Sequence, residues 1–200
     1  MGTTRVAIAG DELVMSYHQD LRQRLEVDGI ELLDPVALGQ SSGCAERLHD
    51  VMRDANPDIG VLGCTPIAWE NREQMLGDER LLLSEYERDL ASCLDAMRGV
   101  CGNQCVFVTA PPIHPERFRP VPAGHEADDV ARLLERRLAQ VNEFAIEFMG
   151  TMNVMVAPLY REISKRLDAS IEADGLSLTE SGRDLAARVV SEAVFGVMHS

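Results

Sequence analysis

The chain alternates short apolar runs with longer stretches in which apolar residues recur at helical intervals. Short runs of β-favouring residues that stop at Gly, Pro or polar residues are typical of strands. We predict strands at residues 6–9, 30–33, 59–62, 106–109 and 153–156. Apolar positions every three or four residues predict amphipathic helices at 13–27, 45–54, 77–97, 127–149 and 179–197. We expect Thr179 to cap the last of these helices.

Strands that alternate with helices indicate an α/β fold, because parallel strands need helical crossovers on the faces of the sheet. The pattern predicts a three-layer α/β/α sandwich over a single domain, residues 1–200, a length that suits one core. In such sheets ligands bind at the carboxyl ends of the strands. The charged residues of the fourth helix are expected to face solvent: Arg132, Glu135, Arg136 and Arg137.

The net charge of −14 and the pI near 4.7 argue against nucleic acid or an anionic membrane as partner. No apolar run approaches the ~20 residues that span a bilayer. The first predicted strand begins within about five residues of Met1, which leaves no room for a signal peptide, so we expect a cytoplasmic protein. Five cysteines without a disulfide-framework spacing fit reduced thiols.

Two short motifs near the ends of the chain carry a family resemblance. The first strand leads into Gly10-Asp11-Glu12-Leu13, and the last helix is preceded by an Asp-x-x-Ser segment from Asp174 to Ser177. The pair resembles the first and last blocks of the SGNH (GDSL) hydrolase family. In that family the blocks read Gly-Asp-Ser-Leu, with the nucleophilic serine third, and Asp-x-x-His. Glu12 stands at the place of the serine and Ser177 at the place of the histidine.

Two interior segments extend the resemblance over essentially the whole chain. Residues 39–44, with Gly43, resemble the block whose glycine N–H serves the oxyanion. Residues 57–66 resemble the Pro-Asp-led strand that ends in Gly-x-Asn-Asp, with Thr65 at the place of the asparagine and Pro66 at that of the aspartate. The resemblance implies a flavodoxin-like five-stranded parallel sheet with a site across the strand tips.

The same alignment predicts the loss of the family's catalytic groups. Ester hydrolysis by this mechanism needs a hydroxyl nucleophile, a histidine base held by aspartate, and donors for the oxyanion. Glu12 offers no alkoxide, and Ser177 is no base near neutral pH. We therefore expect a protein with a degenerate site that binds a small molecule or a partner protein without ordinary esterase activity. We expect no cofactor and no metal, and an oligomer is compatible with the sequence.

Alternatives stay open at this point. Cys64 at a strand end could act as a thiolate nucleophile, with Cys44 at a helix start, or both could be small buried fillers. The carboxylates of Asp11, Glu12 and Asp174 could serve acid–base or metal chemistry, or only caps and turns. Either version would give a repurposed enzyme acting on an acyl, ester-type or biosynthetic intermediate. A purely structural or assembly role is the third alternative.

The candidate residues all fall at predicted strand ends or in the loops beside them. The candidate catalytic residues are Asp11, Glu12, Cys64, Asp174 and Ser177. The candidate ligand-binding residues are Gly10, Gly43, Cys44, Gly63, Thr65, Trp69, Asn71 and His114. For His114 the sequence leaves two interpretations, a side chain that reaches over the site and a solvated loop residue. Cys101 and Cys105 resemble half of a metal knuckle, but a turn entering a strand is the simpler interpretation.

Overall fold

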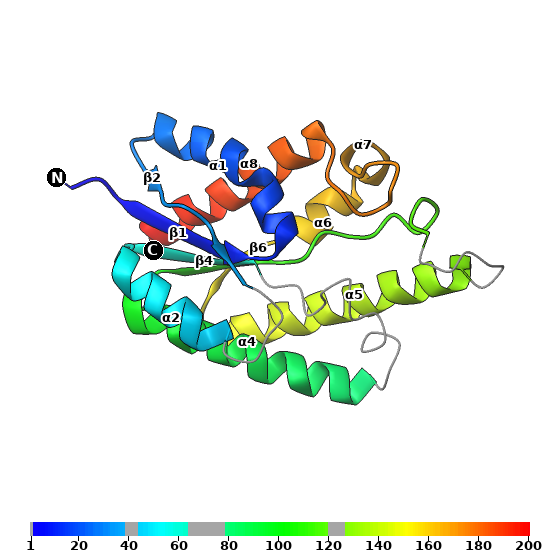
Figure 1. The fold of residues 1–200 in the computed structure, drawn as a ribbon, viewed down its shortest axis with the longest axis horizontal. Helices are drawn as coiled ribbons and strands as arrows, with labels where there is room; N and C mark the ends of the chain where they lie inside the picture. Colours follow the sequence, from blue (N-terminus) through cyan, green and yellow to red (C-terminus); the bar gives the residue numbers. More distant parts are fainter. Residues whose placement is uncertain (1, 39–43, 64–78, 120–126) are drawn as a thin grey trace.

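A computed structural model describes residues 2–38, 44–63, 79–119 and 127–200 of the chain. Figure 1 shows a sheet between two layers of helices. The strands are β1 (Arg5–Gly10), β2 (Glu31–Leu32), β3 (Val36–Ala37), β4 (Ile59–Gly63), β5 (Cys105–Val108) and β6 (Met155–Ala157). The helices are α1 (Glu12–Val27), α2 (Cys44–Ala55), α4 (Glu79–Cys101), α5 (Ala127–Thr151), α6 (Leu159–Ser164), α7 (Leu167–Ser170) and α8 (Glu180–Met198).

Every pairing between these strands is parallel, in the order β2-β1-β4-β5-β6. The predicted α/β sandwich is therefore confirmed, with each of the five predicted strands present in the sheet. Strand β3 was not predicted. It pairs with the end of β1, whereas β2 pairs with its beginning, and Pro35 between them has no N–H to continue the ladder. Strands β2 and β3 thus form one interrupted edge of the sheet.

Alternation along the strands divides the apolar side chains between two cores. Val6 and Ile8 of β1 pack with α1 and α8, whereas Ala7 and Ala9 pack with α2, α4 and α5. Figure 1 shows the same division, with α1, α6, α7 and α8 over one face of the sheet and α2, α4 and α5 over the other. The central strands β1, β4 and β5 are buried on both faces, which explains why they are short, nearly continuous apolar runs.

The predicted helices are confirmed with shifts of a few residues at their ends. Thr179 caps α8 as expected, since its Oγ1 accepts a hydrogen bond from the N–H of Gly182 at 3.0 Å. Helices α6 and α7 were not predicted, because runs of six and four residues are too short to show a helical period. They follow β6 and support the segment that leads to α8.

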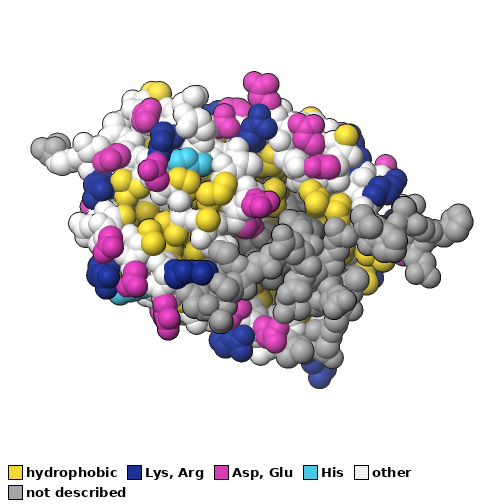
Figure 2. Space-filling model, viewed as in Figure 1, with side chains coloured by type: hydrophobic (Ala, Val, Ile, Leu, Met, Phe, Trp, Pro, Cys, Tyr) yellow, Lys and Arg dark blue, Asp and Glu magenta, His cyan; other side chains and the backbone are white. Residues whose placement is uncertain are grey.

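Charge on the outside of the molecule is mixed. Figure 2 shows acidic and basic side chains interspersed over the face it presents. The negative charge of the chain is therefore not gathered into one acidic patch on that face. Within the part of the chain that the structure describes, no helix combines the length and the apolar character needed to cross a membrane.

Candidate functional site

The tips of β1 and β4 meet beneath the first turn of α1. Gly10 and Gly63 are partners in the sheet register, and Val14 of α1 lies directly over both. A Cβ on Gly10 would stand 2.4 Å from Val14 Cγ2 and from the carbonyl oxygen of Gly63. A Cβ on Gly63 would stand 2.3 Å from the same methyl group. These two candidate residues thus let the helix start close to the sheet, a packing role that does not require a ligand.

Asp11 is the N-cap of α1. Its Oδ1 accepts hydrogen bonds from the N–H groups of Leu13 at 3.0 Å and Val14 at 3.3 Å. Glu12, at the place of the family's serine, is the first residue of the helix and is exposed. A carboxylate at this position interacts favourably with the positive end of the helix dipole. The structure therefore supports capping for Asp11 and leaves the Glu12 side chain accessible at the strand tip.

Asp174 and Ser177 form a closed local turn just before α8. Asp174 Oδ1 accepts from the N–H groups of Leu176 at 2.8 Å and Ser177 at 2.9 Å, and Ser177 Oγ donates to Asp174 Oδ2 at 2.5 Å. Partial burial would raise the pKa of Asp174, but these hydrogen bonds outweigh it and lower the pKa below its usual value. The aspartate of the motif is thus in direct contact with the residue at the histidine's place, but that residue ends in a hydroxyl.

The two motifs lie toward one end of the molecule. Figure 1 shows the start of α1, beside the arrowhead of β1, and the residues that lead into α8 on the side toward which the strands point. Helices α1 and α8 also pack against one another on the same face of the sheet. The fold therefore brings the first and last motifs to the carboxyl end of the sheet, where ligands of such folds bind.

His114 is buried rather than solvated. The residue is only 6% exposed, and its Nε2 lies 2.9 Å from Oδ1 of Asp168 on α7. Its backbone N–H donates to the carbonyl of Gly175, in the turn before α8, at 2.9 Å. Its Nδ1 is buried and finds no hydrogen-bond partner among the residues that the structure describes. This geometry fits a residue that fastens its loop. It contradicts the interpretation of His114 as a solvated loop residue, and the predicted ligand contact stays a prediction.

Arg117 completes this attachment. It donates to Asp168 Oδ1 at 2.9 Å and to the carbonyl oxygen of Ile171 at 2.6 Å. The hydrogen bond with His114 and the charge of Arg117 lower the pKa of Asp168. The loop that follows β5 is thereby fixed to the chain just before the Asp174 turn.

A buried polar cluster behind this loop was missed in the sequence. Asn142 of α5 is buried and forms two hydrogen bonds with the backbone of Ala110, at 2.9 and 3.0 Å. Glu135 accepts from the N–H of Ile113 and from Tyr160 Oη, both at 2.7 Å. The prediction that Glu135 faces solvent is therefore wrong. Its position one turn from the buried Leu138 and two turns from Asn142 was the only available signal.

Burial raises the pKa of Glu135, although its two hydrogen bonds oppose the shift. Burial and the neighbouring carboxylate of Glu135 also raise the pKa of Tyr160. Tyr160 N–H donates in addition to Thr109 Oγ1 at 2.9 Å, which links β5 to α6. These groups hold the loop after β5 from inside the protein.

Several candidates lie outside the described residues: Gly43, Cys64, Thr65, Trp69 and Asn71. Their predicted roles stay predictions. Cys44 begins α2, but its side chain is not described. Burial raises the pKa of Cys101 to about 12 and that of Cys105 to about 11, which makes both poor nucleophiles. The described residues include no group of three His, Cys, Asp or Glu that could hold a metal ion.

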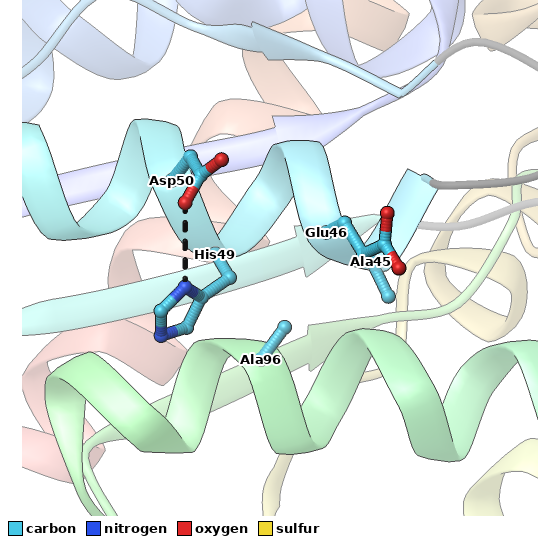
Figure 3. Close-up of a pocket in the computed structure, with 5 residues that line it drawn as sticks. All are labelled: Ala45, Glu46, His49, Asp50 and Ala96. Carbon is cyan, nitrogen blue, oxygen red and sulfur yellow. Dashed lines mark ion pairs between the residues drawn. The ribbon is translucent and has the colours of Figure 1, made fainter.

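Two surface hollows lined by described residues lie away from the two motifs. One, of about 460 Å³, opens between α2 and α4 and is shown in Figure 3. His49 and Asp50 lie on its rim with Nδ1 and Oδ1 3.7 Å apart, a partly exposed surface pair. The other, of about 330 Å³, lies between β6, α6 and α8.

Comparison with known proteins identifies the class of fold. No family model and no curated protein matches the sequence. Solved structures match over nearly the full length, including a lipase/acylhydrolase from Enterococcus faecalis at 14% identity, with 97% of this chain and 96% of that chain covered and a TM-score of 0.72. A putative SGNH hydrolase from Slackia heliotrinireducens matches at 19% identity over 96% and 99% of the two chains, with a TM-score of 0.64.

An acetylxylan esterase from Geobacillus stearothermophilus matches at 14% identity over 97% of this chain and 95% of that chain, with a TM-score of 0.68. The protein therefore has the fold of the SGNH (GDSL) hydrolases, as its sequence motifs predicted. Identities at this level show the fold alone.

Proposed function

We propose that this protein is an SGNH-hydrolase-like binding protein whose cleft at the strand tips holds a small molecule or a partner protein without ordinary ester hydrolysis. One observation carries the proposal. The Asp174 carboxylate contacts Ser177 Oγ at 2.5 Å at the place where the family has its base, while Glu12 occupies the place of the nucleophile. In this proposal the aspartate of the motif is retained and its proton-transfer group is replaced by a hydroxyl.

Neither His114 nor Asp174 supplies the missing chemistry in this proposal. A general base must reach the proton it removes, and His114 is buried with its Nε2 held by Asp168. The hydrogen bonds that lower the pKa of Asp174 make it a weaker base and keep it ionised, so it is also no acid. A carboxylate at Glu12 would repel the negative charge that develops on a tetrahedral intermediate.

The same carboxylates indicate what the cleft favours. Glu12 and Asp174 are both exposed near the carboxyl end of the sheet. Two carboxylates favour a ligand group that is cationic or rich in hydrogen-bond donors, and disfavour a carboxylate or phosphate. We therefore propose a ligand, or a protein segment, that presents an amine, guanidine or similar donor group.

A restored-site experiment tests the loss of chemistry. Wild-type protein is expected to hydrolyse p-nitrophenyl acetate no faster than buffer. The double variant Glu12→Ser with Ser177→His is expected to exceed either single variant by at least tenfold, because nucleophile and base act as a unit. Glu26→Ser, an exposed glutamate at the other end of α1, is the matched control. Wild-type turnover that disappears in Glu12→Ala or Asp174→Ala would overturn the proposal.

A binding experiment tests the ligand. Native mass spectrometry of the purified protein is expected to show a bound mass or, after screening small amines, a saturable complex. Glu12→Arg should weaken that complex at least tenfold, whereas Glu26→Arg should leave it unchanged. Binding that is indifferent to Glu12→Arg and to Asp174→Asn would place the ligand elsewhere.

The enzyme alternative has its own test. A catalytic thiol at Cys64 would react with iodoacetamide faster than a buried thiol, and any activity found would be lost in Cys64→Ser. Slow labelling together with activity that survives the substitution removes this alternative.

A further inference from the structure

The turn before α8 carries two neighbouring oxygen atoms that can accept hydrogen bonds from a ligand. They are Oδ2 of Asp174 and Oγ of Ser177, which lie 2.5 Å apart on two exposed residues. We propose that this pair binds a guanidinium group, so that the cleft selects a guanidine-bearing ligand over a simple amine. The inference rests on the proposed function, because it names the ligand class of the same cleft.

The carboxylate of Asp174 offers a ligand only part of its accepting capacity. Its Oδ1 accepts from the N–H groups of Leu176 at 2.8 Å and Ser177 at 2.9 Å, which fill the two acceptor positions of one carboxylate oxygen. In the hydrogen bonds of the turn, Oδ2 is engaged once, by the Ser177 hydroxyl. A guanidinium therefore cannot pair with both oxygens of this carboxylate, but Oδ2 keeps one acceptor position for it.

Ser177 supplies the second acceptor. Its hydroxyl has a single hydrogen atom, which it donates to Asp174. The hydrogen bonds of the turn outweigh partial burial and lower the pKa of Asp174, so the carboxylate is ionised at neutral pH and has no hydrogen atom to return. Ser177 Oγ is left with its lone pairs and acts toward a ligand as an acceptor.

Two acceptors this close together suit a planar fork of donors. A guanidinium directs two N–H groups in parallel, so that each can point at one of two neighbouring oxygens. The N–H groups of an ammonium diverge from one nitrogen at the tetrahedral angle, and two oxygens 2.5 Å apart cannot both lie along them. We therefore expect an ammonium to form one well-aligned hydrogen bond where a guanidinium forms two.

The turn that carries the acceptor pair is fixed in place by its neighbours. The carbonyl of Gly175, between the two acceptor residues, accepts from His114 N–H at 2.9 Å, and the backbone of Phe118 leaves no room for a Cβ on this glycine. Ile171 and Leu178 pair as an antiparallel bridge at the base of the turn. Groups that are already ordered lose little conformational entropy on binding, so this arrangement favours recognition of a ligand with a matching rigid shape.

An NMR titration of the full chain at neutral pH tests the proposal with two cations of similar size, ethylguanidine and propylamine. The backbone amide signals of Leu176 and Ser177 should shift with both. The dissociation constant should be about tenfold lower for ethylguanidine, because it forms one more charge-assisted hydrogen bond. Blocked Ala-Arg-Ala and Ala-Lys-Ala peptides repeat the comparison for a protein segment. An arginine peptide that binds more tightly than ethylguanidine assigns the guanidinium to a partner protein, and the reverse order assigns it to a small molecule.

Variants of Ser177 test the role of its hydroxyl. Ser177→Ala removes the second acceptor and leaves both backbone hydrogen bonds to Asp174 Oδ1 in place. The affinities for the two cations should then agree to within about twofold, whereas Ser177→Thr keeps the hydroxyl and should keep the preference for ethylguanidine. Ser181→Ala, which changes an exposed serine in the first turn of α8, is the matched control and should also keep it.

The outcomes separate this inference from the function on which it rests. Equal affinity of the wild type for the two cations, or a preference that survives Ser177→Ala, overturns the guanidinium inference and leaves the proposed binding of a cationic ligand intact. Amide signals of Leu176 and Ser177 that shift with neither cation overturn both. The comparison in the wild type needs no variant, so the proposal can be decided even if Ser177→Ala disturbs the turn.

Discussion

The loop that follows β5 and the turn that precedes α8 are in contact, but different kinds of hydrogen bond stabilise them: long-range ones in the loop and local ones in the turn. They meet where His114 N–H binds the carbonyl of Gly175. The loop is fixed by groups far away in sequence: the buried Asn142 and the half-buried Glu135 of α5, and the exposed Asp168 of α7. The turn is fixed by the carboxylate of Asp174, which binds groups two and three residues further on. We therefore expect substitution of Ser177 to change the structure of the turn little. The structure of the loop, in contrast, depends on several residues that are distant in sequence.

The pKa values of two carboxylates, Glu135 and Asp174, are shifted in opposite directions by these two environments. Burial raises the pKa of Glu135, so the fold favours its protonated form. Exposed hydrogen bonds lower the pKa of Asp174, so the fold favours its ionised form. Glu135 is half-buried against the loop after β5, whereas Asp174 is exposed in the turn before α8.

The largest effect is expected at Gly175, where the loop and the turn meet. Gly175 has a φ of +79°, and a Cβ there would stand 2.3 Å from the backbone nitrogen of Phe118. Gly175→Ala should lower the free energy of unfolding by about 3 kcal/mol, from left-handed strain and from a clash with backbone that cannot move aside. Urea unfolding measures the change.

Two glycines separate the causes of that effect. Gly102 has a φ of +61° but open space around its Cβ position, so Gly102→Ala should cost only about 1 kcal/mol. Gly150, near the end of α5, has open space and no positive φ, and Gly150→Ala should be neutral or slightly stabilising. Equal losses in the Gly175 and Gly102 variants would show that the contact with Phe118 is unimportant.

Asn142→Ala tests the buried clamp of the loop. The substitution leaves the N–H and C=O of Ala110 buried without their partner, at a cost of about 2 kcal/mol. Gln140→Ala on the same helix, which removes an exposed hydrogen bond to Glu79, should cost less than about 1 kcal/mol. If both variants lose the same stability, the clamp contributes no more than a surface contact does.

The fold was largely predictable because its signals are local. The strand at 59–62 and the helix at 13–27 carry their periods in consecutive residues, and Thr179 carries its capping role in its type and place. Strand β3 was not predictable, because two residues, Val36 and Ala37, are too few to show a period. They form a strand by pairing with β1. The glycines at the tips of β1 and β4 were predicted as ligand contacts, although Val14 over them explains both.

The polar cluster around Glu135 and Asn142 could not be predicted from the sequence, because its contacts are not local. Nothing in the residues around Glu135 or Asn142 shows that Ile113 and Ala110 would lie opposite them, 22 and 32 positions away. The Asp174–Ser177 contact is different, because it spans three positions and an Asp-x-x-Ser turn determines it locally. Local spacing could be interpreted, and long-range polar pairing could not.

The pH dependence of stability distinguishes Glu135 from Asp174. Of the two substitutions, Glu135→Gln should change the free energy of unfolding more, on the order of 1 kcal/mol for an altered buried hydrogen bond. The folded state raises the pKa of Glu135 above the ordinary 4.5. The stability that it contributes is full below that value and is lost as pH rises through the folded pKa. The wild-type free energy of unfolding, minus that of Glu135→Gln, should therefore fall as pH rises above 4.5. A flat difference would contradict the burial of this carboxylate.

Asp174→Asn should show the opposite sign and the smallest effect, a few tenths of a kcal/mol, because solvent screens an exposed carboxylate. Its folded pKa lies below the ordinary 3.8, so its contribution is present above that value and is lost as pH falls through the folded pKa. The difference between wild type and variant should therefore shrink on acidification below 3.8, as measured by urea unfolding at successive pH values. Ser177→Ala removes one of the bonds that lower this pKa and should move the same loss to higher pH, whereas Glu172→Gln in the same turn serves as the control. A difference that grows on acidification would mean that the hydrogen bonds of this turn do not favour the ionised form.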